Sequence, residues 1–214
     1  MKGYDYSREI KFSKGYEMLR PLGVIVNKLQ YKIEYVGLEN VPAEGGFILA
    51  ANHVNTLDPV FIAIGLKDRQ IHYMGKKELF ENAFTNWLFT KANAFPIARG
   101  KADSEALNYA IRDVKEGNIL GIFPEGTRSR TGKMGRAKSG VAVIAKAAKA
   151  DILPVAFCST DNFKKHTKLT VRFGKMIPFE ELNLGEDSGR EELKAAATYV
   201  MDKIAALQEE GHCK

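Results

Sequence analysis

The chain has 214 residues, 45% of them hydrophobic, which is enough to bury one sizeable core but short for two full domains. Lys and Arg total 32 against 26 Asp and Glu, and the net charge of +6 favours polyanionic partners such as nucleic acid, anionic lipid headgroups or phosphorylated substrates. Cys158 and Cys213 lack the spacing of a disulfide framework or a metal site, and they indicate a reducing compartment.

Membrane-spanning and targeting signals are not evident in the sequence. No apolar run approaches the roughly 18 residues that a spanning helix needs. Residues 1–12 carry too many charges for a signal peptide. We therefore expect a protein that does not cross a bilayer but can lie on one.

The N-terminal residues 1–31 are interpreted as a basic amphipathic segment, followed by one domain over residues 32–214. Residues 17–30 have the apolar spacing of a helix, in which Pro21 is tolerable only near the start or at a kink. Basic residues surround the apolar ones, and two readings remain open: an interfacial membrane anchor, or a helix packed on the domain core. The apolar side chains of the helix include Met18, Leu22, Ile25 and Leu29.

Short apolar runs bounded by Gly, Pro, Asn or charged residues predict buried strands in the rest of the chain. These runs are residues 47–51, 94–98, 119–123, 152–157 and 169–173. Helical patterns run from Ser104 to Glu116, with a cap at Asp103 or Ser104, and from Arg190 to Glu209. The alternation predicts a single-domain α/β fold with a largely parallel sheet flanked by helices.

Polar residues follow three of the predicted strands directly. They are residues 52–53, 96–100 and 124–130. The carboxyl ends of parallel strands meet at one edge of a sheet, where open α/β folds form their ligand crevice. The sequence therefore predicts one site that contains His53, Asp58, Arg99, Glu125 and Arg128.

His53 and Asp58 form an H-x-x-x-x-D pair with two compatible interpretations. In the catalytic one, Asp58 orients His53 and stabilises its protonated ring, so that the other ring nitrogen accepts a proton from a substrate. In the structural one, Asp58 is the N-cap of a helix over residues 59–66 and His53 is an ordinary loop histidine.

The segment after residue 123 combines a carboxylate, a glycine, hydroxyls and two arginines, which is typical of anion binding. The alternative is a solvated basic face. Residues 126–134 resemble a nucleotide-binding P-loop but have the wrong spacing, and no G-x-S-x-G elbow surrounds any serine. Cys158 has no evident base, so direct transfer chemistry is favoured over a covalent intermediate. His72, His166 and His212 stand singly, and we predict no metal.

Four blocks, taken in order, resemble the glycerolipid acyltransferases, in particular 1-acylglycerol-3-phosphate acyltransferases. The blocks are residues 52–59, 95–100, 123–130 and 152–155, within a resemblance that covers residues 35–175. The resemblance implies that His53 is the catalytic base, that Asp58 is its partner, and that residues 32–214 form the acyltransferase domain. The substrate-binding residues that it implies are Arg99, Gly100, Lys101, Glu125, Gly126, Thr127, Arg128 and Pro154.

The implied reaction transfers a fatty acyl chain from acyl-CoA or acyl-carrier protein to the sn-2 hydroxyl of lysophosphatidate and yields phosphatidate, with no cofactor. The implied location is the cytoplasmic face of a membrane with anionic lipids, without a spanning segment. Two alternatives remain open: a related acyltransferase for another lysolipid or glycerol 3-phosphate, and a noncatalytic anionic-lipid-binding module. A nucleic-acid-binding domain is least favoured because no binding motif or interleaved aromatic residues accompany the basic segment, so we expect no nucleic-acid partner.

Overall fold

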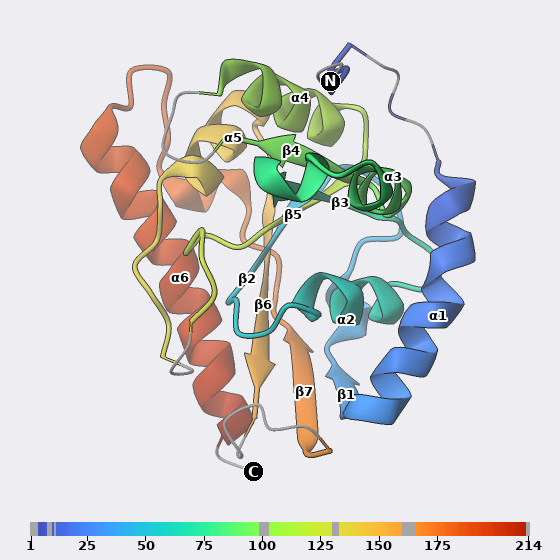
Figure 1. Ribbon diagram of the computed structural model, residues 1–214. Helices are drawn as coiled ribbons and strands as arrows, with labels where there is room; N and C mark the ends of the chain where they lie inside the picture. Colours follow the sequence, from blue (N-terminus) through green and yellow to red (C-terminus); the bar gives the residue numbers. More distant parts are fainter. Residues whose placement is uncertain are drawn as a thin grey trace.

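The computed structural model describes residues 4–7, 10, 12–98, 103–129, 133–159 and 166–212. In this part of the chain, one sheet has the strand order β1-β7-β6-β2-β5-β3-β4 (Figure 1). The strands are β1 (Lys32–Val36), β2 (Phe47–Ala51), β3 (Ile71–Lys76), β4 (Ala94–Ile97), β5 (Ile119–Ile122), β6 (Ile152–Cys158) and β7 (Lys168–Phe173). The α-helices are α1 (Lys14–Gln30), α2 (Asp58–Gly65), α3 (Ala83–Lys91), α4 (Ser104–Lys115), α5 (Gly140–Ala148) and α6 (Arg190–His212). Short 3-10 helices are η1 (Leu38–Asn40), η2 (Lys77–Phe80) and η3 (Phe179–Leu182).

Most strands of the sheet run in the same direction. β2 pairs in parallel with β5 and β6, and β3 pairs in parallel with β4 and β5. β7 is antiparallel to β6, and β1 is parallel to β7. These two strands at one end of the sheet therefore run opposite to the other five. The predicted single α/β domain with a largely parallel sheet is confirmed.

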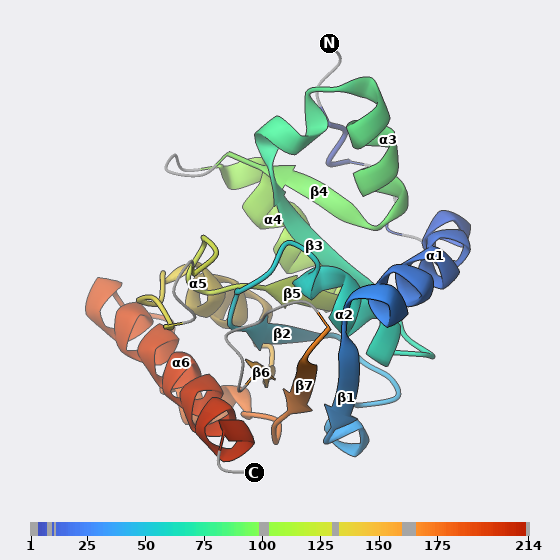
Figure 2. The same cartoon turned by 60° about the horizontal axis from the view of Figure 1, so that its bottom comes forward.

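Helices cover both faces of the sheet (Figure 2). Ile48 and Ala50 of β2 belong to the core that α4, α5 and α6 close, whereas Phe47, Leu49 and Ala51 belong to the core on the side of α2. All five side chains are buried. A strand with two buried faces reads as a continuous apolar run, which is why β2 and its neighbours stand out in the sequence.

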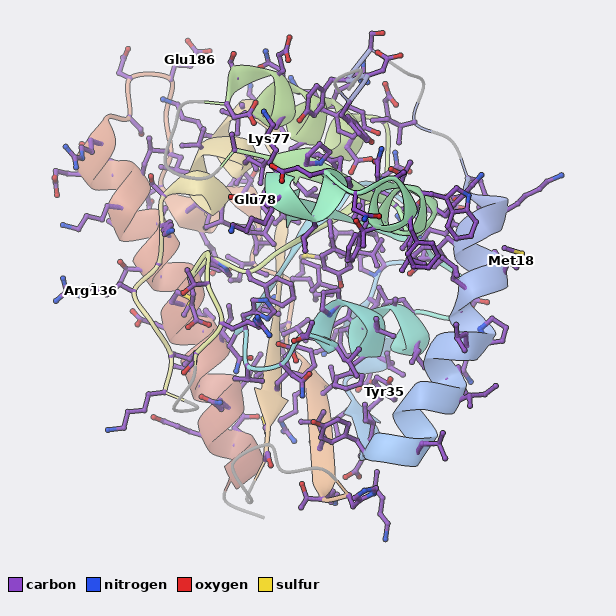
Figure 3. The ribbon with its side chains drawn as sticks, in the orientation of Figure 1. Met18, Tyr35, Lys77, Glu78, Arg136 and Glu186 are labelled. Carbon is purple, nitrogen blue, oxygen red and sulfur yellow. The ribbon has the colours of Figure 1, made fainter. Side chains whose placement is uncertain are left out.

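Helix α1 packs on the domain with one face and exposes an apolar face on the other side. Tyr16 is buried, and Gly23 approaches Val60 of α2 so closely that a Cβ there would lie 2.9 Å from the valine side chain. Met18 points away from the body of the protein (Figure 3), and Leu22 is 58% exposed. The two readings of this segment are therefore compatible. No helix among the described residues is long and apolar enough to cross a membrane.

Candidate functional site

His53 directly follows β2 at the carboxyl edge of the sheet. The side chain of the preceding Asn52 is fully buried, and its Oδ1 accepts a hydrogen bond of 2.8 Å from the main-chain N–H of Phe157 in β6. Asn52 Nδ2 donates to the carbonyl oxygen of Phe157 over 3.3 Å. This side chain continues the link between β2 and β6 where the chain leaves the sheet, and it fixes the start of the loop that carries His53.

The ring of His53 is held by the carboxylate of Asp58. The distance from His53 Nδ1 to Asp58 Oδ2 is 2.7 Å, and the same oxygen accepts the main-chain N–H groups of Val54 at 2.7 Å and Asn55 at 2.8 Å. The Asp58 side chain is fully buried and that of His53 is 15% exposed. With Nδ1 occupied by Asp58, Nε2 is the ring nitrogen left for a substrate.

The predicted N-cap role of Asp58 is wrong. Helix α2 begins at Asp58 itself, and no side chain caps its first turn. The carboxylate instead turns back toward the preceding loop, because His53, Val54 and Asn55 present three N–H donors to one oxygen. These three bonds favour the ionised form of the carboxylate.

Burial and hydrogen bonding act in opposite directions on Asp58. Burial raises the pKa of this carboxyl above its usual range, whereas the bond to His53 and those to the main chain of Asn55 and Val54 lower it. A buried carboxylate of this kind is costly unless a positive charge faces it. When His53 takes up a proton, its positive charge faces the buried carboxylate and stabilises it. This arrangement suits a general base.

Two aromatic rings support the histidine. Phe123, which follows β5, stacks on the imidazole with a centroid distance of 4.0 Å and an interplanar angle of 19°. Tyr73 of β3 lies beyond it, parallel to the phenyl ring at 6.0 Å. The stack restricts rotation of the His53 ring and shields one face of it from water.

The loop after β5 is bonded to the loop that carries His53. Arg128 donates from a guanidinium nitrogen to the hydroxyl of Thr56, and the Ser129 N–H donates to the carbonyl oxygen of His53 over 2.8 Å. Gly126 lies in the turn directly after β5, where its N–H donates to the carbonyl oxygen of Phe123 over 2.9 Å. Its φ of 70° is a left-handed conformation that glycine adopts without strain. The predicted convergence of these two loops is thus present in the fold.

An open cavity of about 750 Å³ lies in front of His53. Its wall carries the positive charges of Lys76 and Arg128, and it includes the hydroxyls of Thr56 and Thr127. The full lining is His53, Val54, Thr56, Lys76, Leu79, Thr127, Arg128 and Ser129. A base at the wall of a basic cavity can deprotonate a hydroxyl of an anionic substrate.

The structure brings together some of the predicted site residues and separates others. His53, Thr127 and Arg128 line the cavity, Asp58 lies behind His53, and Gly126 shapes the turn. Arg99, Gly100 and Lys101 lie outside the described residues.

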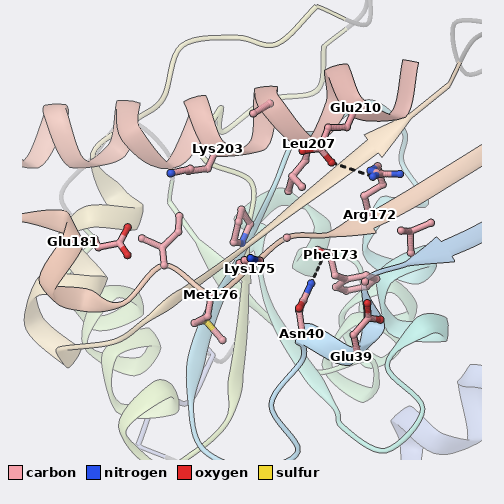
Figure 4. A pocket seen from close by; sticks show the side chains of 16 residues that line it. Glu39, Asn40, Arg172, Phe173, Lys175, Met176, Glu181, Lys203, Leu207 and Glu210 are labelled. Carbon is pink, nitrogen blue, oxygen red and sulfur yellow. Dashed lines mark hydrogen bonds and ion pairs between the residues drawn. The ribbon is translucent and has the colours of Figure 1, made fainter. Parts of the chain in front are cut away.

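Pro154 does not line this cavity. It lies in the middle of β6, paired with Ala50, and borders a different cavity of about 610 Å³ between β7, η1 and α6 (Figure 4). Along β6 the side chains alternate between the two faces of the sheet, and Pro154 shares the α6 face with Ile152 and Ala156. A direct contact with a substrate next to His53 is therefore not supported for Pro154.

Lys76 is a cavity residue that the sequence analysis did not identify. It is the last residue of β3 and forms a 3.1 Å ion pair with Glu78, with both side chains about half exposed. The signal that revealed His53 and Arg128, a polar residue at the carboxyl end of a strand, applies here too. It was missed because residues 71–76 were not recognised as a strand.

Other chemistries find little support among the described residues. No group of three or more His, Cys, Asp and Glu side chains there has the geometry of a metal site. The thiol of Cys158 is buried, and burial raises its pKa to about 11. A protonated thiol is a weak nucleophile, so Cys158 is unsuited to covalent acyl transfer at neutral pH.

Comparisons with known proteins agree with this geometry. Residues 32–158 match the family model described as Acyltransferase. The chain is 31% identical over 187 residues to the 1-acyl-sn-glycerol-3-phosphate acyltransferase of Bacillus subtilis (strain 168), covering 86% of this chain and 92% of that protein. The enzyme of the same name from Streptococcus pneumoniae is 30% identical over 201 residues, covering 91% of this chain and 74% of the other. The crystal structure of the 1-acyl-sn-glycerophosphate acyltransferase of Thermotoga maritima superposes with a TM-score of 0.71 at 25% identity, covering 91% of this chain and 78% of that one.

Proposed function

The chain belongs to the acyltransferase family, and we propose from this premise that it is a 1-acylglycerol-3-phosphate acyltransferase that converts lysophosphatidate to phosphatidate. The observation that carries the assignment is the His53–Asp58 pair at the wall of a cavity that also contains Arg128 and Lys76. The pair supplies a base for a hydroxyl, and the two cations suit a phosphate on the same molecule.

The proposed mechanism is direct transfer between two substrates. Nε2 of His53 removes the proton from the sn-2 hydroxyl as that oxygen attacks the thioester carbonyl carbon. Asp58 stabilises the imidazolium that forms, and the tetrahedral intermediate collapses with cleavage of the carbon–sulfur bond. The imidazolium then returns its proton to the leaving thiolate, so the products are phosphatidate and a free thiol, and His53 is regenerated without a metal or other cofactor. Acyl-CoA and acyl-carrier protein both fit as donors, since each carries the acyl chain as a thioester.

The experiment that tests the function is product analysis with a panel of acceptors. Purified protein and an acyl thioester are supplied with lysophosphatidate, glycerol 3-phosphate, a choline lysolipid and monoacylglycerol, and the products are identified by mass spectrometry. We expect acylation of lysophosphatidate at the highest kcat/KM. Preference for another acceptor would replace the proposed substrate, and phospholipid binding without any turnover would favour a noncatalytic lipid-binding module.

Recognition of the acceptor phosphate is assigned to Arg128 and Lys76, both of which line the cavity. Arg128→Ala is expected to lower kcat/KM for lysophosphatidate by about 10- to 100-fold, the range for one charge-assisted hydrogen bond. Lys76→Ala should have a smaller effect, because the ammonium is half exposed and paired with Glu78.

The measurement is the ratio of kcat/KM for lysophosphatidate to that for monoacylglycerol, in wild type and each variant. Loss of phosphate recognition lowers this ratio. Lys146→Ala serves as a control, because Lys146 bonds to the main-chain oxygens of Glu186 and Ser188 at 2.7 and 2.9 Å and does not line the cavity. An unchanged ratio in Arg128→Ala would show that this arginine has another role.

We also propose that the protein attaches peripherally to a membrane, which the amphiphilic substrate and several exposed apolar side chains support. Met18, Leu22, Ile25 and Leu29 of α1 are all more than half exposed, at 66%, 58%, 56% and 68%. Helix α3, which contacts α1 and η2, adds the exposed and stacked rings of Phe84 and Trp87, and Leu79 of η2 lines the cavity. Aromatic and aliphatic side chains of this kind insert into the interface of a bilayer. We propose the cytoplasmic face of the membrane as the side of attachment.

Removal of the apolar side chains should release the protein from vesicles. The combined substitutions Met18→Gln, Leu22→Gln and Ile25→Gln are expected to reduce co-sedimentation with vesicles that contain anionic lipid by at least ~10-fold, because each loses apolar contact worth about 1 kcal/mol. Glutamine preserves helix propensity. The matched control replaces Ala195 and Thr198, exposed on α6, with glutamine.

Activity on a short-chain, monomeric lysophosphatidate provides the second readout for this α1 variant. It should stay near the wild-type value, since that acceptor needs no membrane. Equal sedimentation of wild type and the α1 variant would exclude α1 as the attachment site.

A further inference from the structure

The peptide groups of His53 are held on both sides by the loop that follows β5. The main-chain N–H of His53 donates to Oε1 of Glu125 over 2.8 Å, and its carbonyl oxygen accepts the N–H of Ser129 at 2.8 Å. Together with the bond from Nδ1 to Asp58, these contacts fix both the main chain and the ring of the proposed base. Of the two groups that bond to the main chain of His53, only the carboxylate of Glu125 carries a formal charge.

Both oxygens of Glu125 are occupied by main-chain groups. Oε2 accepts the N–H of Gly135 at 2.7 Å, and the residue is only 6% exposed. Glu125 is absent from the lining of the cavity in front of His53. Its carboxylate therefore bridges the loop after β2 to the segment at residues 133–139, which another bond, from the Lys138 N–H to the carbonyl oxygen of Pro124, also holds in place.

A substrate-binding role fits these contacts poorly. Both oxygens of Glu125 already accept main-chain N–H groups, and the residue does not line the cavity. A negative charge turned toward a phosphate would also weaken its binding. Residue 135 is a glycine, and a Cβ there would lie only 3.1 Å from Oε2, so the close approach of this main chain to the carboxylate suits a residue without a side chain. The geometry instead suits a fixed support behind the base.

We propose that Glu125 is a positioning residue whose carboxylate holds the main chain of His53 in the orientation from which Nε2 reaches the acceptor hydroxyl. The inference rests on the proposed function, because the orientation matters only if His53 acts as the base. It replaces the substrate-binding role that the sequence implied for Glu125. The charge of Glu125 acts through His53 on the rate of transfer, not on the affinity for lysophosphatidate.

Glu125→Gln is the variant that tests the proposal. Glutamine has nearly the same size, but its NH2 group would face one of the two main-chain donors and lose that bond. We expect kcat to fall by roughly 10- to 100-fold, whereas KM for lysophosphatidate stays within about twofold of wild type. Glu125→Asp, which keeps the charge but shortens the side chain, should recover part of kcat. Glu186→Gln is the control for loss of a carboxylate, because Glu186 is exposed on the loop between η3 and α6 (Figure 3) and does not line the cavity.

Two kinetic outcomes would overturn the proposal. A rise in KM with kcat preserved would return Glu125 to substrate binding. A lower melting temperature with kcat per folded molecule unchanged would reduce Glu125 to a purely structural residue. Thermal unfolding is therefore recorded for each variant, and the kinetics are measured well below its midpoint.

Hydrogen exchange of the His53 main-chain amide gives a readout that does not depend on turnover. We expect this amide to exchange slowly in wild type and at least ~10-fold faster in Glu125→Gln, because the charged acceptor is lost. If the wild-type protein does not acylate lysophosphatidate but the amide still exchanges faster in Glu125→Gln, the proposed function is rejected and the hydrogen bond from His53 to Glu125 is retained. Unchanged exchange in Glu125→Gln would reject the positioning role itself.

Discussion

His53→Ala is expected to reduce the rate of phosphatidate formation by at least ~10²-fold, the usual scale for loss of a general base. The variant should remain folded, because Glu125 and Ser129 bond to the main chain of residue 53 and not to its ring. The rate is measured with saturating lysophosphatidate and acyl thioester, and circular dichroism checks the fold. A rate within a few-fold of wild type would contradict the assignment of the base.

A second buried His–Asp pair offers a matched control for this variant. Nδ1 of His72, near the start of β3, lies 2.5 Å from Oδ1 of Asp113 in α4, and neither residue lines the cavity. His72→Gln should lower stability, since it disturbs a buried pair, but kcat per folded molecule should stay near wild type. A comparable loss of kcat in His72→Gln would mean that the effect of His53→Ala reflects damage to the fold.

Asp58→Asn should also reduce kcat by at least ~10²-fold, because it removes the charge that stabilises the imidazolium. The substitution is nearly isosteric. If the amide oxygen takes the place of Oδ2, it can still accept from His53, Val54 and Asn55, so the loop keeps its hydrogen bonds. The NH2 group then occupies the place of Oδ1, a buried atom with no hydrogen-bond partner among the described residues.

An unpartnered buried NH2 costs about 1–3 kcal/mol, so Asp58→Asn should unfold at a lower denaturant concentration. Stability and rate are separated by urea titration and by kinetics in the absence of denaturant. If activity decreases only in proportion to the folded fraction, Asp58 has a structural role and no catalytic one.

The sequence was sufficient to predict the central strands and the meeting of two loops. Residues 47–51 and 119–123 read as buried strands, and β2 and β5 are indeed parallel neighbours, with Ala50 opposite Ile122. Because His53 follows one of these strands and Arg128 the other, strand direction alone brings them to the same edge. Both β1 and β3 were missed, since β1 alternates polar and apolar residues at the edge of the sheet and β3 ends in Gly75 and Lys76.

The details of the site depend on contacts between distant residues that no local pattern encodes. Glu125 reaches across 72 positions to His53 and 10 positions to Gly135, so its neighbours in the sequence say nothing of its partners. Asp58 before Pro59 has the local pattern of an N-cap. In the structure its carboxylate instead accepts hydrogen bonds from His53, Val54 and Asn55 of the preceding loop. Pro154 matches a sequence block, and only the folded structure shows that it borders the cavity beside α6 and does not line the cavity in front of His53.

The central claim is that the acyl chain passes directly from the thioester to the hydroxyl of lysophosphatidate at His53. A rapid-quench experiment with a radiolabelled acyl thioester tests this most directly, with protein in excess over donor and with lysophosphatidate present or omitted. We predict that label moves to phosphatidate only when the acceptor is present, with one free thiol released per phosphatidate, and that His53→Ala abolishes both events together. Label bound covalently to the protein, or thiol released at the full rate without acceptor, would contradict the account.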